Sequence, residues 1–247
     1  MAMTVIQYKY LIPAKWFHQP ICTFAPMIQY AAIFDMDGTL VDNNAYHFKA
    51  WKDVFEKYNP SIEVTPQFFN EKLSGVPGMP IMHEFFAEYT EDEMQEMFEE
   101  KSRSYREAFA PFAKPINGLE RLLRELKDNG VKLAVATSAA VINIDYMMNL
   151  LPIRSYFDVI IDGPRVSKPK PHPQIFLKAA LDLGVQPEHC VVFEDSLSGV
   201  KAANSAGMKV VGITTTHTAQ ELHPVNLVID DYTGLTAQKL AALFTKN

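Results

Sequence analysis

YAAIFDMDGTL, residues 30–40, decides the fold of this 247-residue chain. Its first five residues form a short apolar run, as in a strand buried on both faces of a sheet. Asp35 follows the run directly, and Gly38 lets the chain turn away sharply in the polar loop that begins there. We therefore expect a buried strand with Asp35 at its carboxyl end.

Downstream of this stretch, short apolar runs alternate with segments of helical period. The expected strands are residues 131–137, 158–161, 190–193, 209–213 and 226–229. The expected helices are residues 118–129, with Asn117 as N-cap and Gly130 as stop, and residues 140–150, 173–184 and 197–206. Such alternation predicts an α/β fold with helices on both faces of a doubly wound, mainly parallel sheet.

The segment between the first strand and this alternating part has a different composition. Residues 42–112 are aromatic, acidic and Met-rich at helical spacing, and a capping box from Thr90 to Glu93 opens a helix that runs to about Phe109. Residues 1–26 carry three prolines and no sustained period, which indicates an irregular extension. We therefore predict a catalytic core of residues 27–41 and 113–247, and an all-helical cap of residues 42–112.

Composition excludes several classes of protein. Hydrophobic residues make up 48% of the chain and charged residues 21%, which excludes a disordered or collagenous protein. The net charge is -6 and no basic run occurs, so neither a nucleic acid nor an anionic membrane is an expected partner. Two distant cysteines and the lack of an apolar run of about 20 residues favour a cytoplasmic protein. No protein partner is indicated.

Polar residues follow four of the expected strands and loops. They are Asp35 and Asp37, Thr137 and Ser138, Lys168, and Glu194 and Asp195. Because the carboxyl ends of parallel strands meet at one edge of the sheet, we expect these side chains to converge there. Several carboxylates, one ammonium and a hydroxyl-bearing turn are what metal-assisted phosphoryl transfer requires.

The carboxylates fit two kinds of role. Asp35 and Asp195 can hold Mg²⁺, with Glu194 assisting through water, because this cation prefers oxygen ligands. Asp35 can also attack the phosphoryl group as a nucleophile. Asp37, two residues on, can then donate a proton to the leaving oxygen.

The remaining residues would neutralise and hold the phosphoryl group. Lys168, stiffened by the following proline, supplies the ammonium, while Thr137 and the Ser138 N–H bind phosphate oxygens beside the Gly38 turn. Each motif alone has an ordinary structural explanation, such as a turn, a helix cap or a solvated loop. Their joint placement at strand ends favours the functional interpretation.

These motifs resemble those of the haloacid dehalogenase-like (HAD) phosphohydrolase superfamily, over about residues 30–235, and within it the beta-phosphoglucomutase-like branch. DMDGTL at 35–40 is similar to the first motif, Thr137 to the second, Lys168 to the third and Glu194-Asp195 to the fourth. The resemblance implies a Rossmann-like core with a helical cap inserted after the first strand. It also implies an aspartyl phosphate at Asp35, and Mg²⁺ held by Asp35, the Asp37 carbonyl and Asp195.

The resemblance extends to the start of the cap, with one departure. YHFKAW at 46–51 is similar to the sugar-phosphate mutases of the superfamily, which would put His47 near Asp37. Where those mutases carry basic residues in a cap loop, this chain reads LSGVPG at 73–78. Ser74 and Gly78 offer no charge for the second phosphate that a mutase must hold.

The expected function is therefore a Mg²⁺-dependent phosphatase of a small phosphorylated metabolite, with sugar phosphates among the candidates. A sugar phosphomutase of the beta-phosphoglucomutase type is the alternative. A phospho-accepting signalling receiver uses similar strand-end residues and represents another class. The cap and Asp37 argue against the receiver, because hydrolysis benefits from a lid that excludes water whereas a receiver needs none.

Overall fold

A computed structural model describes residues 30–245, so the extension expected at 1–26 lies outside the described residues. Within the described range six strands form one sheet, in the order β3-β2-β1-β4-β5-β6. They are β1 (Ala31–Phe34), β2 (Lys132–Ala136), β3 (Val159–Ile161), β4 (Cys190–Glu194), β5 (Lys209–Ile213) and β6 (Leu227–Ile229). Each neighbouring pair is parallel. The predicted α/β fold with a parallel sheet is confirmed.

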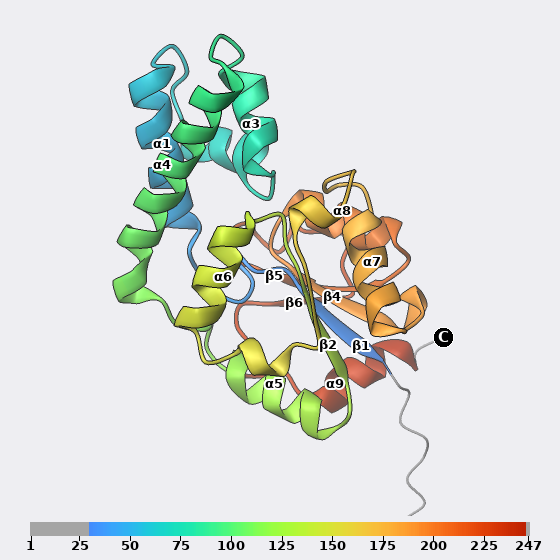
Figure 1. The fold of residues 1–247 in the computed structure, drawn as a ribbon. Helices are drawn as coiled ribbons and strands as arrows, with labels where there is room; N and C mark the ends of the chain where they lie inside the picture. The colour runs from blue at the N-terminus through green and yellow to red at the C-terminus, as the bar shows by residue number, and fades with distance from the viewer. Residues whose placement is uncertain (1–29, 246–247) are drawn as a thin grey trace, which may run out of the picture.

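Helices cover both faces of this sheet and make a three-layer core (Figure 1). The helices α5 (Leu119–Asp128), α6 (Val141–Leu150) and α9 (Ala237–Ala241) pack on one face. On the other face lie α7 (Gln174–Leu183) and α8 (Leu197–Ser205). The helices predicted at 140–150, 173–184 and 197–206 begin and end at, or one residue from, the expected bounds.

Strand β1 is central and buried on both faces. Its side chains alternate: Ala32 and Phe34 pack with α5 and α6, while Ala31 and Ile33 pack with α7 and α8. The ring of Phe34 stacks on that of Phe193 in β4, with centroids 4.3 Å apart. Burial on both faces explains why β1 reads as a continuous apolar run. It also fixes the direction in which the chain leaves the strand at Asp35.

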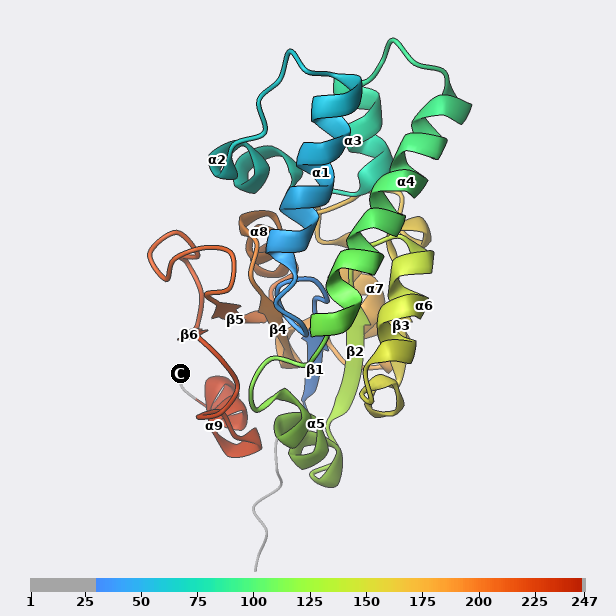
Figure 2. The same ribbon diagram turned by 90° about the vertical axis from the view of Figure 1, so that its left-hand side faces the viewer.

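The segment after β1 forms a helical cap above one end of the sheet (Figure 2). Its helices are α1 (Asn44–Tyr58), α2 (Pro66–Phe68), α3 (Gly78–Phe85) and α4 (Glu91–Phe109), with a π-helical turn at Phe69–Leu73. The cap has its own apolar core, whose buried members are Trp51, Val54, Phe55, Val64, Phe69, Leu73, Ile81, Met82, Phe86, Met94 and Met97. Met82, Met94 and Met97 of this segment therefore serve packing.

The predicted capping box opens α4. The hydroxyl of Thr90 accepts a hydrogen bond from the N–H of Glu93 at 3.3 Å, and the N–H of Thr90 donates to the Glu93 carboxylate at 2.8 Å. Two of the N–H groups at the start of the helix thereby gain partners. The long helix α4 brings residues 98 and 101 over the carboxyl end of the sheet.

The start of α5 differs from the prediction. The helix begins at Leu119 with Gly118, not Asn117, at the N-cap position. Gly118 has φ +80°, and a Cβ there would lie 2.6 Å from the backbone nitrogen of Thr233. The N–H of Tyr232 donates to the carbonyl of Asn117 at 2.9 Å. Close approach of the 232–233 segment thus selects glycine, in preference to a side-chain cap.

Within residues 30–245, no helix is long and apolar enough to cross a membrane.

The packing of α5 gives a stability prediction. Leu122 is fully buried between α5 and the sheet, so Leu122→Ala should lower the free energy of unfolding by about 2–5 kcal/mol. Leu181 on α7 is 75% exposed, so Leu181→Ala should change it by less than about 0.5 kcal/mol. Denaturant titration of both variants measures the difference. Equal losses would show that α5 does not pack on the core as described.

Candidate active site

The parallel register brings the ends of β1, β2 and β4 to one level. Phe34 pairs with Val135 on one side and with Phe193 on the other. The next residue, Asp35, donates its N–H to the carbonyl of Phe193 at 3.0 Å. Thr137 is anchored likewise, through its N–H and the carbonyl of Ile161 at 3.0 Å. The residues that follow the three strands therefore face the same space beneath the cap.

Three buried carboxylates meet in this space. Asp35, Glu194 and Asp195 each place a carboxylate oxygen within 4.8 Å of those of the other two. Burial, with added repulsion from Glu194, raises the pKa of Asp195 to about 7. Burial likewise raises the pKa of Asp35 well above its usual range, against the lowering effect of Lys170. Such a cluster needs cationic partners to stay ionised near neutral pH.

Lys170 is the fixed cation of the cluster. Its Nζ lies 2.6 Å from Oδ1 of Asp35 and also contacts Oε1 of Glu194, and its side chain is 1% exposed. Burial alone would lower the pKa of Lys170, but Asp35 and Glu194 raise it, so the ammonium stays charged. The Nζ also lies 4.9 Å from the centre of the Phe176 ring on α7.

The expectation that Lys168 supplies this ammonium is wrong as to placement. Lys168 is exposed, and its N–H donates at 2.8 Å to Oε1 of Gln174, the first residue of α7. The same amide oxygen accepts from the N–H of Ser167 at 3.1 Å. This pairing fixes the 167–168 backbone outside the cluster, and the chain enters the site only two residues later, at Lys170.

The first loop turns at Gly38, but the structure does not point its N–H at the site. Gly38 has φ +73°, and a Cβ there would lie 2.1 Å from Oδ2 of Asp195. Its N–H donates to Oδ1 of Asn43 at 3.1 Å. The glycine therefore lets the loop pass close to Asp195, and the expected phosphate contact from Gly38 is not supported.

Glu194 and Asp195 are held by different groups. Oε2 of Glu194 accepts from the N–H groups of Asp195 and Ser196 at 3.0 and 2.9 Å, at the start of α8. Asp195 accepts from the hydroxyl of Thr39 at 3.2 Å and from the amide of Asn44 at 3.1 Å. Glu194 is thus oriented by backbone at a helix N-terminus, and Asp195 by side chains of Thr39 in the loop after β1, Asn44 at the start of α1, and Thr216 beyond β5.

Asp37 lies at the boundary of core and cap. Its Oδ1 accepts from Nδ2 of Asn43 at 2.6 Å and lies 3.4 Å from Nε2 of His47 on α1. Burial would raise the pKa of Asp37, but His47, Asn43 and Lys101 together lower it. The structure therefore places His47 beside Asp37 and favours the ionised form of this carboxylate.

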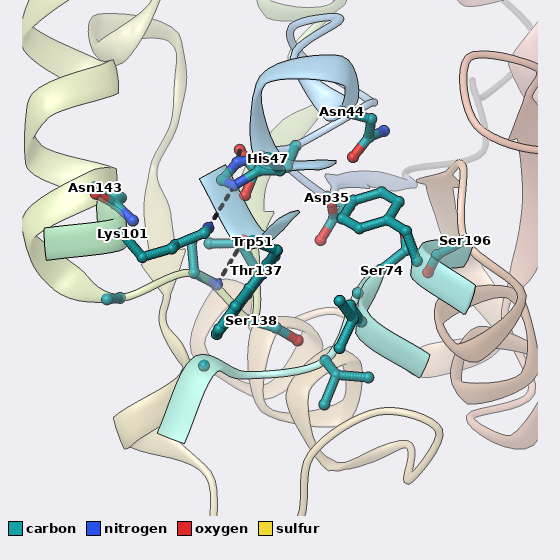
Figure 3. Close-up of a pocket in the computed structure, with 18 of the residues that line it drawn as sticks. Asp35, Asn44, His47, Trp51, Ser74, Lys101, Thr137, Ser138, Asn143 and Ser196 are labelled. Carbon is teal, nitrogen blue, oxygen red and sulfur yellow. Dashed lines mark hydrogen bonds and ion pairs between the residues drawn. The ribbon is translucent and has the colours of Figure 1, made fainter. Parts of the chain in front are cut away.

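Lys101 on α4 completes this group and was missed by sequence reasoning. Its Nζ lies 2.8 Å from Nδ1 of His47, the contact drawn in Figure 3. Burial lowers the pKa of Lys101 to about 8, and burial together with Lys101 lowers the pKa of His47. Because an ammonium can only donate, Nδ1 accepts and the neutral ring carries its proton on Nε2, facing Asp37.

A cavity of about 80 Å³ joins these groups. Core residues Thr137 and Ser138 line it from the loop after β2, and the Oγ1 of Thr137 accepts from the N–H of Ala139 at 3.1 Å. The cap contributes the residues Trp51, Phe69, Leu73, Ser74, Gly75, Val76, Gly78 and Phe98 in addition to His47 and Lys101. A phosphoryl group at Thr137 and Ser138 would lie between the carboxylate cluster and the cap.

Carboxylates and an ammonium gathered at the carboxyl edge of a parallel sheet, beneath a lid, are typical of enzymes that transfer phosphoryl groups. The family model described as haloacid dehalogenase-like hydrolase matches residues 32–213. The chain belongs to this family, in its beta-phosphoglucomutase-like branch.

Individual relatives agree with this assignment. The beta-phosphoglucomutase of Bacillus subtilis is 32% identical over 218 residues, which cover 85% of this chain and 93% of the relative. A phosphorylated carbohydrates phosphatase of Thermotoga maritima is 36% identical over 184 residues, covering 72% and 82%. A beta-phosphoglucomutase structure from Clostridium difficile superposes with a TM-score of 0.78 at 31% identity, covering 88% and 97%. The chain is thus an enzyme, a phosphatase or a phosphomutase.

The two Lys-Pro lysines give a matched test of the site. Lys170→Met should lower kcat/KM for phosphoryl transfer by about 10²-fold or more, because it leaves the buried charges of Asp35 and Glu194 uncompensated. Lys168→Met should change kcat/KM little, because that side chain is exposed. Circular dichroism of both variants controls for folding. If Lys168→Met lost activity and Lys170→Met did not, Lys168 would be the lysine that acts in the site.

Proposed function

We propose that the protein is a Mg²⁺-dependent phosphatase that hydrolyses a small phosphorylated metabolite, with sugar phosphates among the candidate substrates. The observation that carries the proposal is the pairing of Asp35 with Lys170 beneath the cavity. The cap loop that lines this cavity, residues 73–78, supplies no cation. Names of relatives support the reaction class, since both a carbohydrate phosphatase and the Escherichia coli fructose-1-phosphate phosphatase YqaB match the chain.

The carboxylate cluster fits a hard divalent cation. Asp35, Glu194 and Asp195 offer only oxygen donors, and the one ammonium paired with this cluster, that of Lys170, contacts Asp35 and Glu194 but leaves Asp195 without an ion-pair partner among the described residues. Oxygen donors with excess negative charge suit Mg²⁺, and the main-chain carbonyl of Asp37 is the further ligand that the family resemblance implies. When bound, the ion neutralises and orients the phosphoryl oxygens.

The chain's own groups then divide the reaction into two steps. The Asp35 carboxylate attacks phosphorus, an aspartyl phosphate forms, and the bond from phosphorus to the ester oxygen breaks. Asp37, which has to be protonated at this stage, gives its proton to that oxygen, and the alcohol leaves. In the second step Asp37 takes a proton from water, which attacks phosphorus, releases inorganic phosphate and restores Asp35.

The His47 and Lys101 pair readies Asp37 for this exchange. Nε2 of His47 donates toward the Asp37 carboxylate, and Asn43 donates to the same oxygen at 2.6 Å. Both hydrogen bonds stabilise the ionised form, which Asp37 reaches once it has protonated the leaving oxygen and from which it takes a proton from water. His47 and Lys101 belong to α1 and α4, so this arrangement requires the cap to be in place over the core.

The cap loop favours a phosphatase over a mutase. Ser74 and Gly78 line the cavity without charge, and a Cβ on Gly78 would lie 1.9 Å from Cε2 of Phe98. The Phe98 ring therefore fills the space that a side chain at position 78 would need. Lys101 and His47, the basic residues of the cavity lining, are turned toward each other. A second phosphate would find little positive charge on the cap side.

A sugar phosphomutase is the second candidate. The match to the Bacillus subtilis beta-phosphoglucomutase and the placement of His47 beside Asp37 favour it. In a mutase, Asp37 would have to accept its proton from a sugar hydroxyl in preference to water. A cap residue beside it, such as His47, is suited to direct it toward that hydroxyl. A signalling receiver is not favoured, since it has no use for a cap.

The first experiment is a phosphate-release screen over sugar phosphates and other phosphomonoesters, with Mg²⁺ or with chelator, together with a hexose-phosphate isomerisation assay. We expect phosphate release to require Mg²⁺ and to be faster than isomerisation of the hexose phosphate. Asp35→Asn should retain less than about one tenth of wild-type turnover, because an amide is a poor nucleophile. Isomerisation faster than release, with a bisphosphate primer present, would identify a mutase.

Asp37→Asn tests the proton donor. We expect a loss of about 10²- to 10⁴-fold in rate on an alkyl or sugar phosphate, with Mg²⁺ dependence kept because the ligand at this residue is its carbonyl. An aryl phosphate has a better leaving group and should lose less. Parallel kinetics on the two substrates measure the contrast, and equal losses would argue against Asp37 as the acid.

A further inference from the structure

A second, larger cleft adjoins the phosphoryl site. It measures about 320 Å³, against about 80 Å³ for the cavity at the aspartates. The two spaces share the wall residues Gly78, Phe98, Ser138, Ala139 and Ala140. A phosphoryl group held at Ser138 would therefore lie where the two spaces adjoin, between the cap and the core.

The walls of this cleft are mostly apolar. From the cap come Pro77, Met79, Pro80 and Phe98, and from the core come Ala139, Ala140, Pro164, Val166, Pro169 and Ile175. Lys170 is the charged residue of the lining, and its Nζ is already paired with Asp35 and Glu194. An ionic group in this cleft would lose water without gaining a free partner of opposite charge.

Phe98 gives the cleft its shape at the junction. Its ring occupies the space beside Gly78, where a Cβ would lie 1.9 Å from Cε2. The missing side chain at position 78 thus lets an aromatic ring form the shared wall. Mostly apolar walls with a few polar groups, here Ser138 and Ser167 besides the paired Lys170, are the usual form of a small-molecule subsite.

We propose that this cleft binds the leaving group of the substrate, and that the leaving group is an uncharged alcohol bearing an apolar ring. The inference rests on the proposed phosphatase function and narrows its substrate class. The phosphoryl end is held at the polar cavity, and the ring lies between Phe98 and Met79 of the cap and Val166 of the core. A bisphosphate or a carboxylated alcohol is excluded by the lack of free charge.

The test compares 2-phenylethyl phosphate with ethyl phosphate, two esters with similar leaving oxygens that differ by one ring. We expect kcat/KM to favour the phenylethyl ester by about tenfold or more, since the ring is removed from water. Val166→Asp and Met79→Glu, which put a charge into the cleft from opposite sides, should each bring this ratio close to one. The ratio is internal to each variant, so partial loss of folded protein does not affect it.

Val141→Asp is the matched control. Val141 is 44% exposed on α6 and lies outside both cavities, so this variant should keep the wild-type ratio. A wild-type ratio near one would overturn the inference and leave the phosphatase standing. So would a high ratio that survives both Val166→Asp and Met79→Glu. Failure of both esters to release phosphate, from an enzyme that releases it from other phosphomonoesters with Mg²⁺, would overturn this inference alone, whereas no release from any ester of the wider screen would overturn the proposed function.

Discussion

The ion pair between Lys170 and the buried carboxylates Asp35 and Glu194 is the interaction on which the site depends. Three carboxylates of this cluster lie almost without contact with water, and burial of such charges costs several kcal/mol each unless they are compensated. Lys170 compensates part of this charge and leaves an excess for a cation to balance. The same excess negative charge that makes the cluster costly to bury makes it suited to hold Mg²⁺, and the ion would then attract an anionic phosphoryl group.

This constraint extends into the backbone around the cluster. A Cβ at Gly38 would lie 2.1 Å from Asp195, and one at Gly199 would lie 1.8 Å from Oε1 of Glu194. Two glycines, on the loop after β1 and in the first turn of α8, thus allow the chain to close around the carboxylates. The parallel sheet sets the level of the strand ends, but the absence of side chains at these two positions lets the charged groups approach each other.

The carboxylates could be predicted from sequence because each directly follows a buried apolar run. To place Asp35, Glu194 and Asp195 in one site, it was enough to know that the carboxyl ends of parallel strands meet at one edge of the sheet. The sequence could not show which of Lys168 and Lys170 supplies the ammonium, because each is followed by a proline. The residue that fixes the backbone at Lys168 is Gln174, which belongs to another element, α7. The nearness of Lys170 to the start of α7 was the available signal. Lys101 lies 54 residues from His47 in the chain, and no local pattern joins the two. The N-cap position of Gly118 could likewise not be predicted locally, because it is selected by close contact with the backbone of Thr233.

The cap shows how substrate choice can be built from packing. The ring of Phe98 fills the space that a side chain at position 78 would need. A basic residue at position 78 could therefore be accommodated only if Phe98 moved or was replaced. Charge for a second phosphate and an aromatic wall for a leaving group are therefore mutually exclusive at this point of the cap. Because the carboxylate cluster is unaffected by that choice, we infer that one catalytic core can serve either reaction and that the pair of residues at 78 and 98 helps to select the substrate.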